Sequence, residues 1–347
     1  MHAAVTEEYK RVVWKEVPEP GYKSNQVLVK VGAASICGSD EHIFKGDFHP
    51  RTSTPLIQGH EFMGSVAEVG SEVKGFKPGE RVVVDPIIWC GECPACKMGH
   101  YPACTKLRLV GVDLDGGFGE YVAVDDSMLF KIGDNVANQH AALVEVYGIG
   151  FHACKRAELK AGDTAVVWGT GKVGHCVYQA ARTITDNTIF LVDVLPNRLK
   201  IAEAHYENVI TIDANKEDPV EVIKNHTGGA GVDVAFEVVG HAHDVPGRVH
   251  PVRGCIQSIH GAGVVCVLGL ADDPAPLVMK ELIWREAKII ASRVSHGEMK
   301  DAIEHLEKGN LKPEAVISHQ IHPREAQKAY EWLQNQPDQY LKVIMNF

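Results

Sequence analysis

The sequence has no long apolar run. None of its segments approaches the roughly 20 consecutive apolar residues that a membrane-spanning helix requires. The opening stretch, MHAAVTEEYKRVVWKEV, carries charges throughout, whereas a secretory signal places a basic start before an apolar core. We therefore expect no membrane partner and a cytoplasmic location.

Basic charge is scarce as well. The chain has 35 Lys and Arg against 45 Asp and Glu, a net charge of −10. Nucleic-acid binding needs clustered cations to neutralise phosphates, so nucleic acid is excluded as the main partner. Internal repeats and low-complexity segments are also lacking. With 45% hydrophobic and 23% charged residues, the 347-residue chain is typical of globular proteins and long enough for two domains.

Cysteines are few, but four of the nine lie within fifteen residues. Their spacing is C-x2-C-x2-C-x7-C, which lets four thiolates converge on one tetrahedral zinc. A closed shell of four sulfurs leaves no position for substrate, so this zinc is expected to be structural. The alternatives are two strained disulfides or unrelated buried thiols. The four candidate ligands are Cys90, Cys93, Cys96 and Cys104, and the expected core thiols are Cys154, Cys176, Cys255 and Cys266.

A second metal site is indicated elsewhere in the chain. One thiolate, one imidazole and a carboxylate make a zinc site whose fourth position stays open for water or substrate, as catalytic sites require. Each of these residues alone is more often a core thiol or a satisfied polar group, and it is their combination that predicts a catalytic zinc. The candidate ligands are Cys37, His60, Glu61 and Glu145, with the two glutamates competing for the third position.

A dinucleotide site is predicted where G-x-G-x-x-G follows the apolar strand TAVVW and begins a helix. The glycines allow a tight turn and a close backbone approach to the pyrophosphate, at the positive end of the helix dipole. Asp193 ends the next strand 24 residues after Gly169, where a carboxylate binds the ribose diol and repels a 2′-phosphate. NAD is therefore favoured over NADP. The candidate cofactor residues are Gly169, Gly171, Lys172, Val173, Gly174, Asp193, Arg198 and Leu268, with Arg198 equally well explained as a solvated helix charge.

The pattern of elements changes near residue 149. Residues 1–148 contain short β patterns such as QVLVKVGAA and ERVVVDP between Gly and Pro turns, which predicts a mostly antiparallel, barrel-like unit. Beyond it, largely apolar strands alternate with helices, the pattern of a parallel sheet covered on both faces.

These motifs together resemble the zinc-containing medium-chain dehydrogenases, the superfamily of alcohol, sorbitol and threonine dehydrogenases. The likeness rests on C-G-S-D at 37–40, G-H-E at 59–61, the four-cysteine segment, D-G-G-F-G-E-Y at 115–121 and the glycine loop, and it covers essentially the whole chain. The sorbitol/polyol and threonine branches are the most similar, because Glu145 stands where other alcohol dehydrogenases use cysteine.

The resemblance implies an α/β fold class with two domains. A GroES-like catalytic domain with the structural zinc lobe spans 1–148 and is completed by 290–347, and a doubly wound (Rossmann) NAD domain spans 149–289. It also implies two zinc ions per chain, a homotetramer or homodimer, and oxidation of a small secondary alcohol, such as a polyol, through a zinc-bound alkoxide to a ketone. The alternatives are threonine 3-dehydrogenase activity and a catalytically inert fold that only binds the cofactor.

The resemblance further assigns roles around the catalytic zinc. Glu61 is expected to coordinate directly and Glu145 to lie on the metal's other side. Ser39 is expected to pass the substrate proton to the cofactor ribose and His42 to complete that relay, while a capping serine and an exposed histidine are the simpler readings. Asp40 is expected to orient His60. Arg293 resembles an arginine near the active-site cleft, and a structural ion pair explains it equally well.

Two departures from the family pattern stand out, and one loop bears on the substrate. Val146 follows Glu145 where many relatives have proline. Residues 241–263 are longer and richer in His and Arg than usual, which suggests a cofactor-side contact or a subunit interface. The loop KGDFHPRTSTP at 45–55 is expected to line the substrate path, where Phe48, His49 or Arg51 would contact hydroxyls or an acidic group, although a solvated loop arginine explains Arg51 better.

Overall fold

Two compact units make up the chain. The computed structural model describes residues 1–240, 248–272 and 274–347. One unit joins Met1–Val146 to Met299–Phe347, and the other is Tyr147–Glu298. Part of the predicted 241–263 contact segment, 241–247, lies outside the described residues. Among the helices that are described, none has the length and apolar character needed to cross a membrane.

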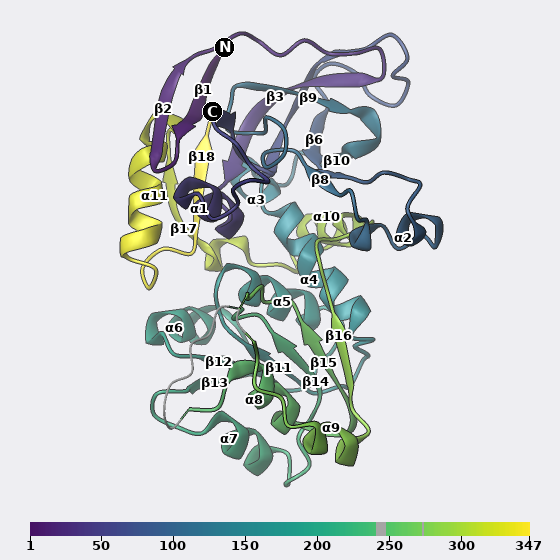
Figure 1. The fold of residues 1–347 in the computed structure, drawn as a ribbon, viewed down its shortest axis with the longest axis vertical. Coiled ribbons are helices and arrows are strands. Elements are labelled where there is room, and N and C mark those ends of the chain that lie inside the picture. The colour runs from purple at the N-terminus through teal and green to yellow at the C-terminus, as the bar shows by residue number, and fades with distance from the viewer. Residues whose placement is uncertain (241–247, 273) are drawn as a thin grey trace. The chain divides into compact units, whose positions relative to one another are not determined.

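The first unit is mostly β (Figure 1). Its main sheet has the order β10-β6-β5-β3-β18-β17, with β9 paired to β3, and β2-β1-β4 and β7-β8 form two smaller sheets. Its strands are β1 (His2–Glu8), β2 (Arg11–Glu16), β3 (Gln26–Ser35), β4 (Leu56–Ile57), β5 (Glu61–Val69), β6 (Arg81–Val84), β7 (Ile87–Ile88), β8 (Arg108–Leu109), β9 (Tyr121–Asp125), β10 (Leu129–Lys131), β17 (Ile317–Ile321) and β18 (Lys342–Asn346). Its helices are α1 (Gly38–Lys45), α2 (Pro94–Lys97), α3 (Asn138–Ala141), α10 (Met299–Glu307) and α11 (Ala326–Asn335), with short 3-10 turns at Tyr101–Ala103, Asp126–Met128, Pro313–Ala315 and Pro323–Glu325.

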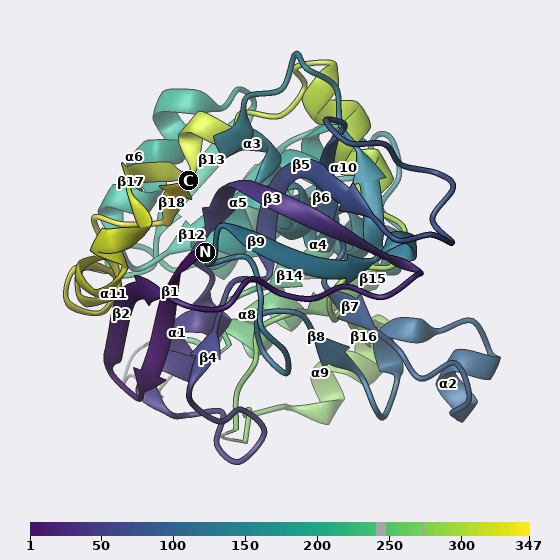
Figure 2. The ribbon, with the colours of Figure 1, turned by 90° about the horizontal axis from the view of Figure 1, so that it is seen from above.

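The last strand of the chain belongs to this sheet. β18 pairs antiparallel with β3, where Ile344 lies opposite Ser35, and parallel with β17. On its other side β3 pairs with β5, while β9 pairs with the first half of β3 on the same edge as β18 and runs beside it in Figure 2. Side chains from these strands and from α11 share one core, and each such side chain removed from water contributes roughly 1.5–3 kcal/mol. The C-terminal segment therefore supplies residues to the same unit as the N-terminal one.

The second unit is a doubly wound parallel sheet in the order β13-β12-β11-β14-β15-β16, as predicted. The central strands β11 and β12 are buried along their whole length, which explains their apolar composition. Its strands are β11 (Ala165–Trp168), β12 (Ile189–Asp193), β13 (Val209–Asp213), β14 (Val232–Glu237), β15 (Ile259–Val267) and β16 (Lys288–Ala291). Its helices are α5 (Lys172–Arg182), α6 (Pro196–His205), α7 (Pro219–His226), α8 (Pro251–Ser258) and α9 (Met279–Arg285), and α4 (Val144–Arg156) begins at the boundary.

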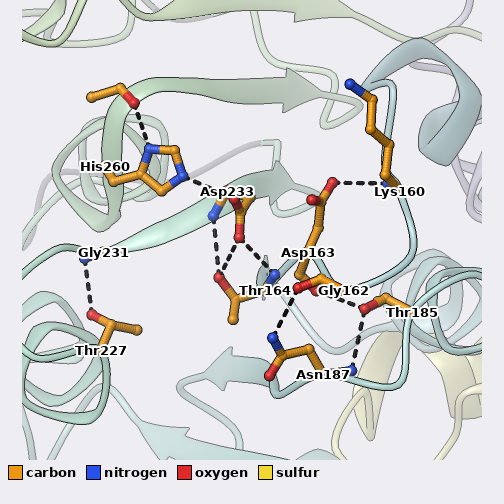
Figure 3. A network of polar contacts seen from close by, with 11 residues as sticks. Lys160, Gly162, Asp163, Thr164, Thr185, Asn187, Thr227, Gly231, Asp233 and His260 are labelled. Atoms are coloured by element: carbon orange, nitrogen blue, oxygen red, sulfur yellow. Dashed lines mark hydrogen bonds and ion pairs between the residues drawn. The ribbon is translucent and has the colours of Figure 1, made fainter.

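A polar network ties together the amino ends of these strands (Figure 3). Thr164, just before β11, donates from its backbone N–H and its hydroxyl to Asp233 Oδ2, both at 2.7 Å. His260 Nε2 contacts the other oxygen of Asp233 at 2.9 Å. Thr227 accepts from the N–H of Gly231 in the same region. These contacts stabilise the amino edge of the sheet, whereas ligands of such sheets bind at the carboxyl edge.

Candidate metal centres and cofactor site

The four clustered cysteines converge as predicted. The Sγ atoms of Cys93 and Cys96 lie 3.5 Å apart, those of Cys90 and Cys104 lie 3.6 Å apart, and all four lie within 4.8 Å of one another. Zn–S bonds of about 2.3 Å place tetrahedral sulfurs about 3.8 Å apart, so the cluster fits one zinc. All nine cysteines of the chain are free thiols, which rules out the alternative of two disulfides.

The short helix α2 sets this geometry. Cys93 caps its amino end, Pro94 takes the first helical position, and Cys96 lies one turn on. Hydrogen bonds from backbone N–H groups lower the pKa of Cys93 to about 6, whereas burial raises the pKa of Cys96 to about 12. Without a cation the cluster therefore resists full ionisation, and a bound divalent metal would remove that conflict.

Cys37, His60 and Glu61 form the second group. One ligand atom from each lies within 4.8 Å of the other two. Cys37 caps α1, and His60 and Glu61 stand at the start of β5, preceded by Gly59. Gly59 has φ +98°, and a Cβ there would lie 2.3 Å from the ring of Phe118, so only glycine fits. Backbone geometry thus places three residues from two distant segments at one point.

Asp40, on α1, contacts both Cys37 and His60. Its Oδ2 accepts from the backbone N–H of Cys37 at 2.8 Å, and its Oδ1 lies 3.6 Å from His60 Nδ1. Burial opposes protonation of His60, but the negative charges of Asp40 and Cys37 outweigh it and raise the pKa of the imidazole well above its usual value. The pocket therefore has a negative potential that a cation would satisfy.

The two candidate glutamates have different surroundings. Lys342, from β18, donates to both carboxylate oxygens of Glu61, and neither side chain is exposed. Burial works against ionisation of Glu61, but Lys342 outweighs it and lowers the pKa of that carboxyl. Glu145 is also buried, and its Oε2 has no hydrogen-bond partner among the described residues. Burial raises the pKa of Glu145 to about 8.

An unpartnered buried carboxyl oxygen is costly, and a metal would satisfy it. Glu145 lies in the first turn of α4, outside the close group of three ligand atoms. The donor set of sulfur, imidazole and carboxylate therefore fits a catalytic zinc, with Glu145 as an additional carboxylate. Sequence reasoning did not find Lys342, because it lies 281 residues from Glu61 and no local motif marks it.

The predicted relay residues, Ser39 and His42, both lie on α1. Ser39 is half-buried on that helix, and His42 Nδ1 lies 2.8 Å from Asp47 Oδ2.

Arg51 donates twice to Asp113, at 2.9 and 2.7 Å. This pairing uses two of the five N–H donors of the guanidinium, so contact of Arg51 with an acidic group on the substrate stays a prediction. Arg293 is exposed, just beyond β16.

A cavity of about 900 Å³ lies at the carboxyl edge of the sheet in the second unit. It is lined by Gly169, Gly171, Asp193 and Arg198 from the predicted set, together with Lys216 and Arg248. Among the described residues, its lining does not include Lys172, Val173, Gly174 or Leu268. Lys172 and Val173 are the first residues of α5, and Leu268 follows β15 and donates its N–H to Glu237 O.

The glycine loop has the close packing that its motif predicts. Gly169 has φ +96°, and a Cβ on Gly174 would lie 1.8 Å from the carbonyl oxygen of Gly169. Gly171 lines the cavity and caps the amino end of α5, so the positive end of the helix dipole lies at the cavity wall. The loop therefore fits a pyrophosphate.

Thr170 is a residue that motif reasoning missed. Its N–H and its hydroxyl both donate to Asp193 Oδ2, at 2.7 and 2.9 Å. Asp193 Oδ1 accepts from the N–H groups of Val194 and Leu195, and Arg198 lies 3.7 Å from Oδ2. These donors fix the carboxylate at the cavity wall, where the cofactor ribose would have to share its oxygens.

Comparison with known proteins places this site in context. Residues 23–134 match the family model of the alcohol dehydrogenase GroES-like domain, and residues 173–308 match that of the zinc-binding dehydrogenase. Sorbitol dehydrogenase of Bacillus subtilis (strain 168) is 31% identical over 99% of the chain and 97% of the relative. L-threonine 3-dehydrogenase of Bacillus velezensis is 32% identical over 95% and 94%.

Two solved structures are similar along the whole chain. RspB, an alcohol dehydrogenase from Escherichia coli CFT073 in complex with NADH, superimposes with a TM-score of 0.88 at 28% identity, covering 100% of this chain and 99% of that one. A structure described as a zinc-binding dehydrogenase from Sinorhizobium meliloti 1021 bound to NADP gives 0.91 at 29% identity, with the same coverage.

Proposed function

The chain belongs to the zinc-containing medium-chain alcohol dehydrogenase superfamily, and on this premise we propose that it oxidises a polyol or related secondary alcohol to a ketone with NAD+. The predicted superfamily, fold class and enzyme class are confirmed by the family matches and the similar structures. The observation that carries the substrate proposal is the group of half-buried Cys37 with buried His60 and Glu61, which together with buried Glu145 makes a carboxylate-rich donor set.

A bound zinc would supply polarisation of the alcohol oxygen, and the nicotinamide would supply the acceptor for the hydride of the carbinol carbon, so that the alcohol becomes a ketone. Cys37 and His60 would hold the metal, and Asp40 would orient His60 through Nδ1. Glu61, paired with Lys342, adds a carboxylate without adding net negative charge. Ser39 would accept the hydroxyl proton and His42 would complete the relay, because a hydroxyl and an imidazole can each both accept and donate a proton.

We propose NAD rather than NADP as the cofactor. The Asp193 carboxylate in the cavity wall repels a 2′-phosphate, and the similar structure of RspB holds NADH. Because another similar structure holds NADP, the rates with NAD+ and NADP+ have to be compared directly.

Threonine 3-dehydrogenase activity is the second candidate. It is favoured by the 32% identity to an L-threonine 3-dehydrogenase over nearly the full chain. L-Threonine is also a secondary alcohol, so the same donor set serves both reactions. The substrate, and not the mechanism, separates the two candidates.

We also propose that the enzyme is a cytoplasmic homo-oligomer. Nine free thiols suit a reducing compartment. Large apolar side chains on α9 are exposed, among them Ile283 and Trp284, and in the described part of the sheet β16 has a strand neighbour on one side only. A second copy would cover both features.

Metal counting combined with a substrate screen tests the proposal. We expect two zinc ions per chain and NADH formation with sugar alcohols, and little NADPH formation from NADP+. Robust turnover of L-threonine with none of sugar alcohols would favour the second candidate. A single zinc, lost when Cys90 and Cys93 are replaced by serine, would support an inert cofactor-binding fold instead.

A further inference from the structure

His42 is contacted by the three residues that follow α1, Gly46, Asp47 and Phe48. Gly46 caps the helix with φ +93° and donates its N–H to His42 O at 3.0 Å. Asp47 donates its own N–H to the same oxygen at 2.9 Å, and its side-chain Oδ2 lies 2.8 Å from His42 Nδ1. The ring of Phe48 stacks on the imidazole at 5.8 Å between centroids and 2° between planes. Three consecutive residues thus contact one histidine.

The loop that supplies these contacts is itself anchored. The hydroxyl of Tyr9 donates to Thr52 O at 3.1 Å, and the N–H of Thr52 donates to Phe48 O at 3.0 Å. The bidentate contact of Arg51 with Asp113 holds the same loop from another side. The position of Asp47 is therefore set by the fold around it as well as by its contact with His42.

Stability alone does not explain this arrangement. The side chains of His42 and Asp47 are 37% and 50% exposed, and ion pairs so exposed to solvent contribute little to folding. What the contact does set is the tautomer of the ring. An ionised carboxylate can only accept, so Nδ1 must carry the hydrogen and the lone pair of a neutral imidazole is on Nε2.

We propose that Asp47 is a positioning residue for the proton relay, an inference that rests on the proposed function. It holds the His42 imidazole in the Nδ1–H tautomer with its ring oriented by Phe48, so that Nε2 receives the substrate proton and afterwards releases it to water. Asp47 itself does not take up the proton. Partners that fix the tautomer and ring orientation of a metal-ligating histidine change activity by about 10- to 100-fold, and for the exposed Asp47 we expect an effect at the lower end of that range.

Kinetics of the zinc-loaded enzyme test the proposal. Asp47→Ala should lower kcat/KM for the alcohol about tenfold, while the Kd for NAD+ stays within about twofold, because the cofactor cavity is unchanged. The kcat/KM of Asp47→Asn should lie between those of wild type and Asp47→Ala, since the amide oxygen still accepts from Nδ1–H. Asp134→Asn, at a 98% exposed carboxylate, is the matched control for a general charge effect and should leave kcat/KM unchanged.

A double-mutant cycle shows whether Asp47 acts through His42. In a His42→Ala background, Asp47→Ala should cause no further loss. An equal loss in both backgrounds, or an unchanged kcat/KM in the single variant, would overturn the proposal. Comparable melting temperatures for all variants would exclude misfolding as the cause.

The tautomer can be read without any turnover. In protein labelled with 15N-histidine, the His42 resonances should show the Nδ1–H form in wild type and move towards the Nε2–H form in Asp47→Ala. If the wild type oxidises no alcohol, the proposed function fails, but this NMR signature still shows whether Asp47 holds His42 in the Nδ1–H tautomer. A wild-type His42 in the Nε2–H form would refute the proposed role of Asp47, whether or not the enzyme is active.

Discussion

Glu61 and Lys342 form an ion pair that is fully removed from solvent. Desolvating two charges costs several kcal/mol per ion, so such a pair adds little net stability, although breaking it by removing one partner is strongly destabilising. Next to a zinc site, the pair sets the charge of a candidate ligand. Lys342 keeps Glu61 ionised without metal, whereas Glu145, which lacks such a partner among the described residues, is held protonated by burial, with its pKa at about 8.

The two glutamates should therefore respond differently to the same substitution. Glu61→Gln removes the carboxylate that faces the buried Lys342 ammonium, so the metal-free protein should lose roughly 3–5 kcal/mol of unfolding free energy. Glu145→Gln replaces a neutral acid with a neutral amide and should change that free energy by less than about 1 kcal/mol, a typical value for a substitution that creates no buried charge. It should nonetheless weaken zinc binding at the catalytic site at least about tenfold.

Urea unfolding of the chelated proteins and zinc titration measure the two effects separately. The double variant Glu61→Gln/Lys342→Met is the control, because it removes both charges and should recover much of the lost stability. Equal destabilisation by Glu61→Gln and Glu145→Gln, or full zinc affinity in Glu145→Gln, would contradict this account.

Local motifs explain what the sequence could predict at this scale. The spacing of Cys90 to Cys104 and the glycine loop are short-range patterns whose geometry follows from the chain itself. The pairs Lys342–Glu61 and Arg51–Asp113 join residues 281 and 62 positions apart, so only the folded sheet reveals them. Thr170 and Asp47 lie inside motifs that were noticed, but hydrogen bonds between side chains leave no spacing signature.

Among the elements, α4 connects two features of the structure. Glu145 lies in its first turn, while His152 and Lys155 near its end contact Glu298, at 3.2 and 2.7 Å. Glu298 is 2% exposed and directly precedes α10. Burial opposes ionisation of Glu298, but His152, Lys155 and the N–H of His296 outweigh it and lower the pKa of the carboxyl to about 2.

This contact should make stability depend on pH in a defined window. The folded-state pKa of Glu298 lies below the unfolded value of about 4.3, so its contribution is fully present above that value and is lost as the pH falls towards 2. At neutral pH the contribution is at most about 3 kcal/mol. Glu298→Gln should therefore be less stable than wild type at pH 7, and the difference should shrink between pH 4.5 and 3.

Urea midpoints of the metal-free proteins at several pH values check this expectation. Glu304→Gln, which removes a solvent-exposed contact of α10 with Lys308, should change the pH dependence much less than Glu298→Gln. Parallel curves for wild type and Glu298→Gln would show that Glu298 does not titrate in this window.

At the scale of the whole molecule, the alternation of strands and helices after residue 149 predicted the parallel sheet correctly, because fully buried strands must be apolar. It did not predict where the sheet is left open. The described part of β16 pairs with β15 alone, and α9 next to it in sequence exposes Met279, Ile283 and Trp284 at 60%, 71% and 75%. An open strand edge beside exposed apolar side chains is a site for association.

The homo-oligomer proposed from these features makes a direct prediction about mass. A two-fold axis brings the same surface of two copies together, so one change alters the interface twice. Ile283→Glu combined with Trp284→Glu should place charge at that interface and convert the protein into a monomer of 37.9 kDa with an unchanged circular dichroism spectrum. Met98→Glu, at a 77% exposed apolar position in the zinc lobe, is the matched control and should keep the wild-type mass. Light scattering coupled to size-exclusion chromatography distinguishes the two, and a double variant that stays oligomeric would assign the association to another surface.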